Sequence, residues 1–239
     1  LGDDALILGH RLSEWCSKAP FLEEDLALTN VALDYIGRAR MFYSYAAKLS
    51  GDGRSEDSFA YLRDCREFTN LLLHELPRGD FAFTMARQYL VDEYALAFMH
   101  ALLDSSDQQL AGIAAKTVKE SKYHLRRSRD WILRLGDGTA ESHQRLQTAV
   151  DDLWVYTHEL FELDELETSL VAAGIAVDSS ALKPAWAAAV RTTLDEATIV
   201  VPADGWSVRG GRQGMHTESL GHLLSELQFM QRAYPGLEW

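Results

Sequence analysis

The amino-acid sequence predicts an all-α protein built as an antiparallel helical bundle. Apolar residues recur at three- and four-residue steps along most of the chain, which is the period of an amphipathic helix. Pro77, Pro202 and Pro235 fall where expected segments end, as helix-breaking residues should. The expected helices are ~20 to 28 residues long, and helices of that length joined by short turns are typical of bundles.

Four long helices are expected in the first part of the chain. Gly51 and Gly53 end the first of them, in keeping with glycine after a helix terminus. Ser55 is a suitable N-cap for the second, which Pro77 stops. Ser105 begins the fourth, which includes the stretch KESKYHLRRS and stops at Gly136. The expected ranges are residues 22–49, 55–75, 81–103 and 105–135.

The second part of the chain predicts one more long helix and several shorter ones. The expected ranges are residues 139–163, 164–173, 180–197 and 217–233. Residues 198–201, Thr-Ile-Val-Val, form the only strand-like piece, and the glycine-rich loop GWSVRGGRQG precedes the last helix. Because the sequence contains neither an internal repeat nor a linker-like stretch, we expect a single domain over residues 1–239.

Composition excludes several classes of protein. The formal net charge of −13 argues against binding to nucleic acid, which needs a broad cationic surface. No apolar run approaches the ~18 residues of a membrane-spanning helix, and the acidic start of the chain is unlike a signal peptide. The two cysteines, Cys16 and Cys65, are too few for a disulfide scaffold or a zinc site. These observations predict a cytoplasmic protein without a membrane partner.

Helical bundles of this size often hold two metal ions, which requires two Glu-x-x-His pairs on facing helices. None of the eight histidines has an acidic residue three positions before it, so this motif is absent. Glu120 with His124 and Glu218 with His222 are four residues apart, but ordinary surface helices produce such pairs easily. The residues alone therefore predict a bundle without an active-site signature.

Basic residues gather locally in this acidic chain. Two alternatives stay open for them: a solvated helix face, or a cationic rim for an acidic partner or a phosphorylated ligand. The candidates for such contacts are Lys116, Lys119, Arg126 and Arg127 in one expected helix and Arg209 and Arg212 in the glycine-rich loop.

Seven stretches spread over the chain carry a family resemblance. They are LGDDALILGHRLSEW, EEDLALTNVALDYIGRARM, LLLHELPRGDFA, KYHLRRS, LGDGTAESH, GRQGMHTESLG and QRAYPG. Together they resemble the PaaC family, the structural subunits of the ring-epoxidising phenylacetyl-CoA monooxygenases. The resemblance implies a ferritin-like bundle with additional C-terminal helices. It also implies a role in aerobic phenylacetate degradation.

The same resemblance implies the partners. Members of this family pair with a homologous catalytic subunit, PaaA, whose di-iron centre epoxidises the aromatic ring with electrons from a separate reductase. Members like this chain serve as scaffolding without a metal cofactor of their own. A homodimer is an expected state of the chain in isolation.

Set against the catalytic subunit, the chain keeps half of the six di-iron ligand positions. Glu14, Asp92 and His124 are ligand-type residues, whereas Tyr35, Arg38 and Ser121 replace the others. The resemblance therefore implies a degenerate di-iron site. Our hypothesis is that Arg38 pairs with Glu14 or Asp92 and substitutes for the charge of the metal, with help from Lys122 if that side chain faces inward.

Two other functions compete with a structural subunit. The first is a metal-binding oxidoreductase that uses Glu14, Asp92, Glu120 and His124 around one metal. The second is a stand-alone helical protein that binds a coenzyme A ligand. A partner-binding role requires exposed apolar surface, for which the candidates are Phe42, Tyr43, Tyr45, Phe59 and Tyr61, although the same residues would equally well fill the core.

Overall fold

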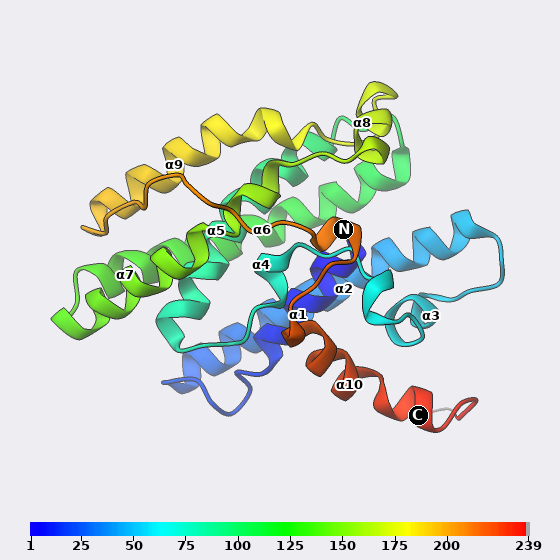
Figure 1. Cartoon of the computed structure of the whole chain (residues 1–239), viewed down its shortest axis with the longest axis horizontal. Helices are drawn as coiled ribbons and strands as arrows, with labels where there is room; N and C mark the ends of the chain where they lie inside the picture. Colours follow the sequence, from blue (N-terminus) through cyan, green and yellow to red (C-terminus); the bar gives the residue numbers. More distant parts are fainter. Residues whose placement is uncertain (238–239) are drawn as a thin grey trace. The chain divides into compact units, whose positions relative to one another are not determined.

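The computed structural model describes residues 1–237, and all regular structure in that range is helical (Figure 1). The predicted fold class, an all-α ferritin-like bundle with additional C-terminal helices, is confirmed. The α-helices of the described residues are α1 (Gly2–Ser13), α2 (Leu22–Ser50), α3 (Glu56–Tyr61), α4 (Leu72–Glu75), α5 (Phe81–Leu102), α6 (Gln108–Gly136), α7 (Ala140–Trp154), α8 (Glu165–Ala172), α9 (Lys183–Glu196) and α10 (Glu218–Ala233). Short 3-10 helices are η1 (Cys65–Glu67), η2 (Thr157–Phe161), η3 (Ser179–Leu182) and η4 (Gly211–Gln213).

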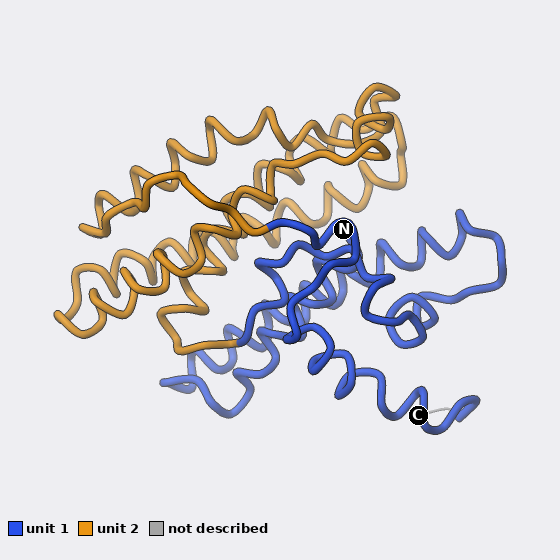
Figure 2. Tube along the Cα trace, in the orientation of Figure 1, with its two compact units in different colours: residues 1–77, 209–239 blue, residues 78–208 orange. Residues whose placement is uncertain are grey.

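The chain forms two compact units (Figure 2). Unit 1 combines residues 1–77 with the C-terminal segment from residue 209, and unit 2 contains residues 78–208. Each unit is centred on two antiparallel helices in close contact, α1 with α2 in unit 1 and α5 with α6 in unit 2. The expectation of a single domain over residues 1–239 stays a prediction.

The helix pair of unit 1 packs closely because α1 carries small residues on its inner face. A Cβ atom added at Gly2 would meet the ring of Tyr43, and one added at Gly9 would meet the backbone of Ala32 and the side chain of Tyr35. Ile7, Leu8 and Leu12 of α1 are fully buried. Apolar spacing does not single out α1 in the sequence, because most of its residues, polar ones included, are buried.

The expected helix over residues 55–75 is wrong after its first turns. Ser55 does cap α3, but that helix ends at Tyr61. The backbone N–H groups of Thr69 and Leu71 donate to the carboxylates of Asp3 and Asp4, both at 2.8 Å. An N–H group held by a side chain of α1 cannot also donate along a helix. Tertiary hydrogen bonds thus replace the continuous helix with η1 and α4.

Unit 2 is organised around α5, which is buried on most of its surface and has no polar face. Helices α6, α7 and α9 all pack against it. The indole N–H of Trp186 on α9 donates to the carbonyl oxygen of Leu90 at 3.0 Å, which fixes α9 to the middle of α5. At the N-terminal end of α5, Phe81 meets Trp131 of α6 edge-on, with ring centroids 4.8 Å apart.

Two further expectations in unit 2 are corrected. The helix expected over residues 139–163 ends at Trp154, because the carbonyl oxygen of Val155 accepts from the N–H of Val208 instead of continuing the helix. Residues 198–201 form no strand. The side-chain amide of Gln147 donates to the carbonyl oxygen of Val200 at 2.9 Å and accepts from its N–H at 2.8 Å. One glutamine thus takes the place of a neighbouring strand.

Within the described residues, no helix is long and apolar enough to cross a membrane.

Gly136 offers a sharp test of the packing in unit 2. A Cβ atom at this position would lie 2.2 Å from the carbonyl oxygen of Ala197, whereas a Cβ at Gly112 in the same helix would meet nothing within 4 Å. We expect Gly136→Ala to lower the free energy of unfolding by about 1–3 kcal/mol. Gly112→Ala, the control, should raise it by about 0.5–1 kcal/mol, because alanine loses less backbone entropy in a helix. Urea denaturation of both variants measures the difference, and equal effects would contradict the packing.

Candidate functional site

The six positions that the resemblance aligns with a di-iron centre are divided between the two units. Glu14, Tyr35 and Arg38 belong to unit 1, and Asp92, Ser121 and His124 belong to unit 2. We therefore describe the two groups separately.

In unit 2, Asp92 of α5 faces the buried side of α6. Its carboxylate accepts hydrogen bonds from the side-chain amide of Gln88 at 2.6 Å and from the hydroxyl of Ser128 at 2.8 Å. Ser121, His124 and Ser128 lie on one face of α6, at steps of three and four residues, and all are buried. The three aligned positions of unit 2 therefore all lie on buried helix faces.

In unit 1, Arg38 is almost fully buried on α2, with 3% of its surface exposed. Its guanidinium group lies over the ring of Tyr35, 4.6 Å from the ring centre, and a cation in that place is stabilised by the π-electrons. Glu14 follows the last turn of α1 and accepts from the guanidinium of Arg11 at 2.6 Å. Two of the substituted positions, a phenol and a guanidinium, thus contact each other directly.

A phenol, a guanidinium and a hydroxyl do not supply the carboxylate and imidazole ligands that a di-iron centre requires. In residues 1–237, no group of three or more His, Cys, Asp or Glu side chains is placed to hold a metal ion. Glu120, part of the competing metal site, is half-buried one position away from the buried face of α6. The pairing of Arg38 with Glu14 or Asp92 stays a prediction.

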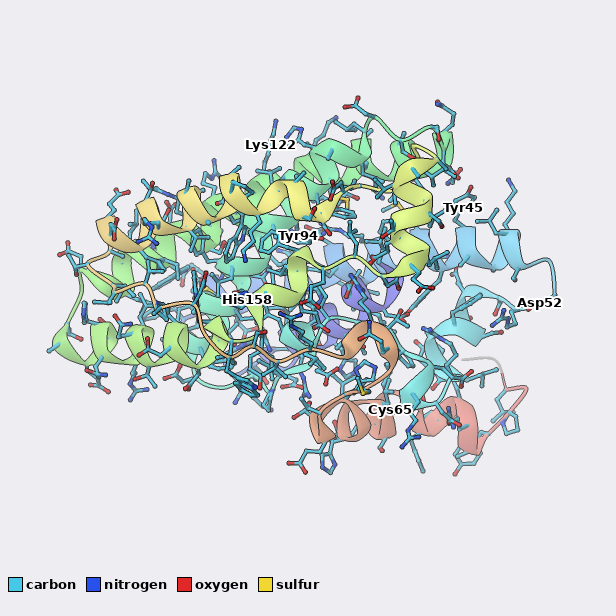
Figure 3. All side chains as sticks on the ribbon, turned by 45° about the horizontal axis from the view of Figure 1, so that its top comes forward. Tyr45, Asp52, Cys65, Tyr94, Lys122 and His158 are labelled. Carbon is cyan, nitrogen blue, oxygen red and sulfur yellow. The ribbon has the colours of Figure 1, made fainter. Side chains whose placement is uncertain are left out.

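The expectation that Lys122 assists Arg38 depended on an inward-facing side chain, and it is wrong. Lys122 is exposed on the outer side of α6 (Figure 3). Its neighbours along the chain explain this, because the buried face of the helix contains Ser121 and His124, and Lys122 lies about 100° away from Ser121 around the axis.

The basic residues proposed to contact a partner or coenzyme A phosphates fall into two groups. Lys116, Lys119 and Arg126 are exposed on α6, and Arg209 is exposed in the loop before η4. Arg127 is half-buried, with its guanidinium 3.8 Å from the sulfur of Met85. The expectation for Arg212 is corrected. Its guanidinium donates to Asp4 at 2.9 Å and to the carbonyl oxygen of Thr69 at 2.7 Å, so it pairs with groups inside unit 1.

Arg212 belongs to a buried polar network at the start of α1 that motif searching missed. Asp4 accepts from Arg212, from the backbone of Leu71 and from a ring nitrogen of His74 at 3.2 Å. Burial alone would raise the pKa of Asp4, but the charge of Arg212 and the contact with His74 hold that pKa well below its usual range. The carboxylate is therefore ionised and paired inside the protein.

Asp3 forms a second branch of this network. Its carboxylate is paired with the guanidinium of Arg63 at 2.5 Å and accepts from the hydroxyl of Tyr43 at 2.7 Å. Burial raises the pKa of Asp3, but the hydrogen bond and charge of Arg63 outweigh it, so the pKa is lowered. The first turn of α1 is thereby connected both to α2 and to the segment that precedes α4.

Glu75 forms the third branch of the network. The carboxylate accepts from the N–H of Thr217 at 2.6 Å and from Asn70 at 2.9 Å, and it lies 2.7 Å from Nδ1 of His216. Nε2 of His216 lies 2.8 Å from the carbonyl oxygen of Phe68, which can only accept. The side chain of His216 thus joins Glu75 to the backbone of Phe68 inside unit 1.

The network predicts how stability depends on pH. Because the pKa of Asp4 is lower in the folded than in the unfolded chain, its stabilising effect is complete above the unfolded value of 3.8 and is lost as the pH falls through the folded value. Asp4→Asn should lower the free energy of unfolding at pH 7 by about 3–5 kcal/mol, since it leaves Arg212 buried without its counter-charge. The difference in the free energy of unfolding between Asp4→Asn and the unsubstituted protein should become smaller only below about pH 4.

Asp104→Asn, at an exposed position in unit 2, is the control for this measurement and should leave the unfolding curve unchanged. Thermal unfolding of both variants between acidic and neutral pH gives the comparison. A deficit of equal size at every pH would contradict the assignment of an ionised Asp4.

Arg38 gives the second prediction. Replacing it by leucine removes a buried cation and its contact with Tyr35, and if the cation balances a buried carboxylate, that carboxylate is left unpaired. We expect Arg38→Leu to cost about 3 kcal/mol or more and to lower the melting temperature. Arg40→Leu is the matched control on α2, because Arg40 is exposed and its ion pair with Glu56 should contribute less than about 1 kcal/mol. An unchanged melting temperature for Arg38→Leu would exclude a charge-balancing role.

Comparison with known proteins identifies the relatives of this chain. The model of the PaaA_PaaC family, described as phenylacetic acid catabolic protein, matches residues 1–239. A subunit of the 1,2-phenylacetyl-CoA epoxidase of Escherichia coli (strain K12) is 51% identical over 239 residues, which is 100% of this chain and 96% of that protein. The resemblance inferred from the sequence is confirmed, and the chain belongs to the PaaA_PaaC family of phenylacetic acid catabolic proteins.

Proposed function

We propose that this chain is a structural subunit of a multicomponent phenylacetyl-CoA ring-epoxidising oxygenase, in which it binds and stabilises a homologous di-iron catalytic subunit. The observation that carries the proposal is the identity of 51% to a subunit of the Escherichia coli epoxidase, which extends over the whole chain. The other expected partners are the remaining epoxidase components, including a reductase, and the expected location is the cytoplasm.

The residues at the ligand-equivalent positions support a non-catalytic role. Tyr35 and Arg38 contact each other on α2, and Glu14 accepts from Arg11. Such groups contribute packing and charge compensation to the protein rather than open coordination positions for a metal. The competing oxidoreductase with Glu14, Asp92, Glu120 and His124 around one metal has no comparable observation in its favour.

A scaffolding subunit needs a surface for its partner, and α2 provides an apolar one. Phe42 and Tyr43, two of the residues suggested for this purpose, are instead buried, and Tyr45, Phe59 and Tyr61 are only half-exposed. Three of the exposed apolar residues of α2 are Leu22 at 71%, Leu26 at 56% and Leu33 at 59%. Their spacing of four and seven residues places them on one face of the helix. We propose that this face, which we call the α2 leucine face, takes part in binding the catalytic subunit.

Co-expression of this chain with the catalytic subunit tests the proposal. A tag on this chain should retain the catalytic subunit, and phenylacetyl-CoA turnover with electrons from the reductase should depend on the presence of both chains. Isolation of a fully active catalytic subunit without this chain would contradict the proposed role.

The same experiment tests the α2 leucine face. Leu26→Glu combined with Leu33→Glu should reduce the co-purified catalytic subunit at least tenfold, because two carboxylates would have to be desolvated in the interface. Gln109→Glu combined with Ala115→Glu, at exposed positions of α6, is the control for introducing charge. Normal retention by the leucine variant would place the interface elsewhere, while loss in both variants would indicate a general effect of charge.

A further inference from the structure

Unit 2 contains a cleft that the proposed scaffolding role does not use. It lies between the end of α7, η2, the face of α9 and the loop of residues 201–204, and its volume is about 360 Å³. Pockets for small molecules have volumes from about 300 Å³ upward, so the cleft has room for a ligand of modest size. Figure 3 labels His158, which lies on η2 at the edge of this cleft.

Three aromatic side chains form the apolar wall. The rings of Trp154 and Trp186 lie 5.9 Å apart at an angle of 31°, and Phe161 meets Trp186 edge-on at 5.1 Å. The indole N–H groups are occupied, that of Trp154 by Asp204 at 3.2 Å and that of Trp186 by the backbone of α5. Each of the three residues is more than nine-tenths buried, so the wall offers a ligand a limited area of ring and no free indole N–H group.

Two cations face the cleft from α9. Lys183, Ala187 and Arg191 line it at steps of four residues, so they share one side of the helix, and the small Ala187 leaves space between the two charges. Lys183 and Arg191 are about 12 Å apart along the axis. Among residues 1–237, neither takes part in an ion pair. In a chain with a net charge of −13, two cations without counter-ions beside an aromatic wall form a distinct local environment.

The remaining polar groups of the cleft are His158 and Asp204. Nε2 of His158 is buried and has no hydrogen-bond partner, because the nearest carboxylate oxygen, on Asp204, is 3.6 Å away. Asp204 is 67% exposed and is the only carboxylate among the residues that line the cleft. With Lys183 and Arg191, the lining thus has an excess of positive charge.

We propose that this cleft is a binding site for a small organic anion with a flat aromatic body, of the aryl carboxylate class. The ring lies against the exposed parts of Trp154, Trp186 and Phe161, and the carboxylate is held by Lys183 and Arg191. A purely inorganic anion leaves the aromatic wall uncovered, and a neutral aromatic molecule leaves the two cations uncompensated. The ligand class follows from this combination, independently of the proposed function.

Calorimetric titration of the full chain at low ionic strength tests the site with three probes. Phenylacetate has both a ring and a carboxylate, 2-phenylethanol has the ring without the charge, and acetate has the charge without the ring. We expect phenylacetate to bind with a dissociation constant of about 1 mM or lower, and each of the other two to bind at least tenfold more weakly. Equal affinities for phenylacetate and 2-phenylethanol would overturn the proposal. So would the absence of binding at a phenylacetate concentration of about 10 mM, tenfold above the expected dissociation constant.

Variants locate the binding in the cleft. Lys183→Gln combined with Arg191→Gln should weaken phenylacetate at least tenfold, and Ala187→Leu should abolish binding by filling the space between the cations. Lys119→Gln combined with Arg126→Gln, which makes the same change in net charge on the outer side of α6, should leave the affinity unchanged. All four replaced cations are exposed, so the variants should fold normally, and a thermal melt checks this. An equal loss of affinity in the two double variants would show a non-specific charge effect and contradict the site.

Discussion

The carboxylates of Asp3, Asp4 and Glu75 are buried in unit 1, and the rest of that unit depends on keeping them paired. An unpaired carboxylate in a protein interior is very unfavourable, so each one dictates the position of its partners. Asp3 requires Arg63, Asp4 requires Arg212 and His74, and Glu75 requires His216 with the N–H of Thr217. These partners come from three separated parts of the chain. The polar network thus fixes both the course of residues 63–76 and the docking of the loop before α10 onto α1.

This constraint accounts for charged residues in three of the stretches that carry the family resemblance. The segments beginning LGDD, LLLHEL and GRQGMH contain Asp3 and Asp4, His74 and Glu75, and Arg212 and His216, respectively. These segments contain no catalytic or metal-binding motif, because their charged residues form hydrogen bonds and ion pairs with one another. A glycine of the third segment allows this polar network to form. A Cβ atom at Gly211 would lie 2.2 Å from the carbonyl oxygen of Asn70, so only glycine allows the loop to approach so closely.

The sequence predicts the long helices well and the tertiary polar contacts poorly, for a physical reason. The bounds of α2, α5 and α6 follow from local signals, such as Gly51 in the left-handed conformation and the caps of Asp80 and Asp107. The contacts of Arg212 with Asp4 and of His216 with Glu75 join residues 208 and 141 positions apart, and no local pattern announces them. Arg212 was therefore expected to meet a ligand, and residues 62–71 were expected to continue a helix. By contrast, Ser121 and His124 share the buried face of α6, which their three-residue spacing indicates because helical spacing is a local property.

We propose that this member of the PaaA_PaaC family contributes binding surface and internal charge pairing instead of metal chemistry. The most direct test is elemental analysis of the isolated chain after expression in iron-supplemented medium, with a co-purified sample of the catalytic subunit as the positive control. We expect far less than one iron per copy of this chain and a loaded centre in the control. Stoichiometric iron in the isolated chain, removed by replacing His124 with alanine, would contradict it.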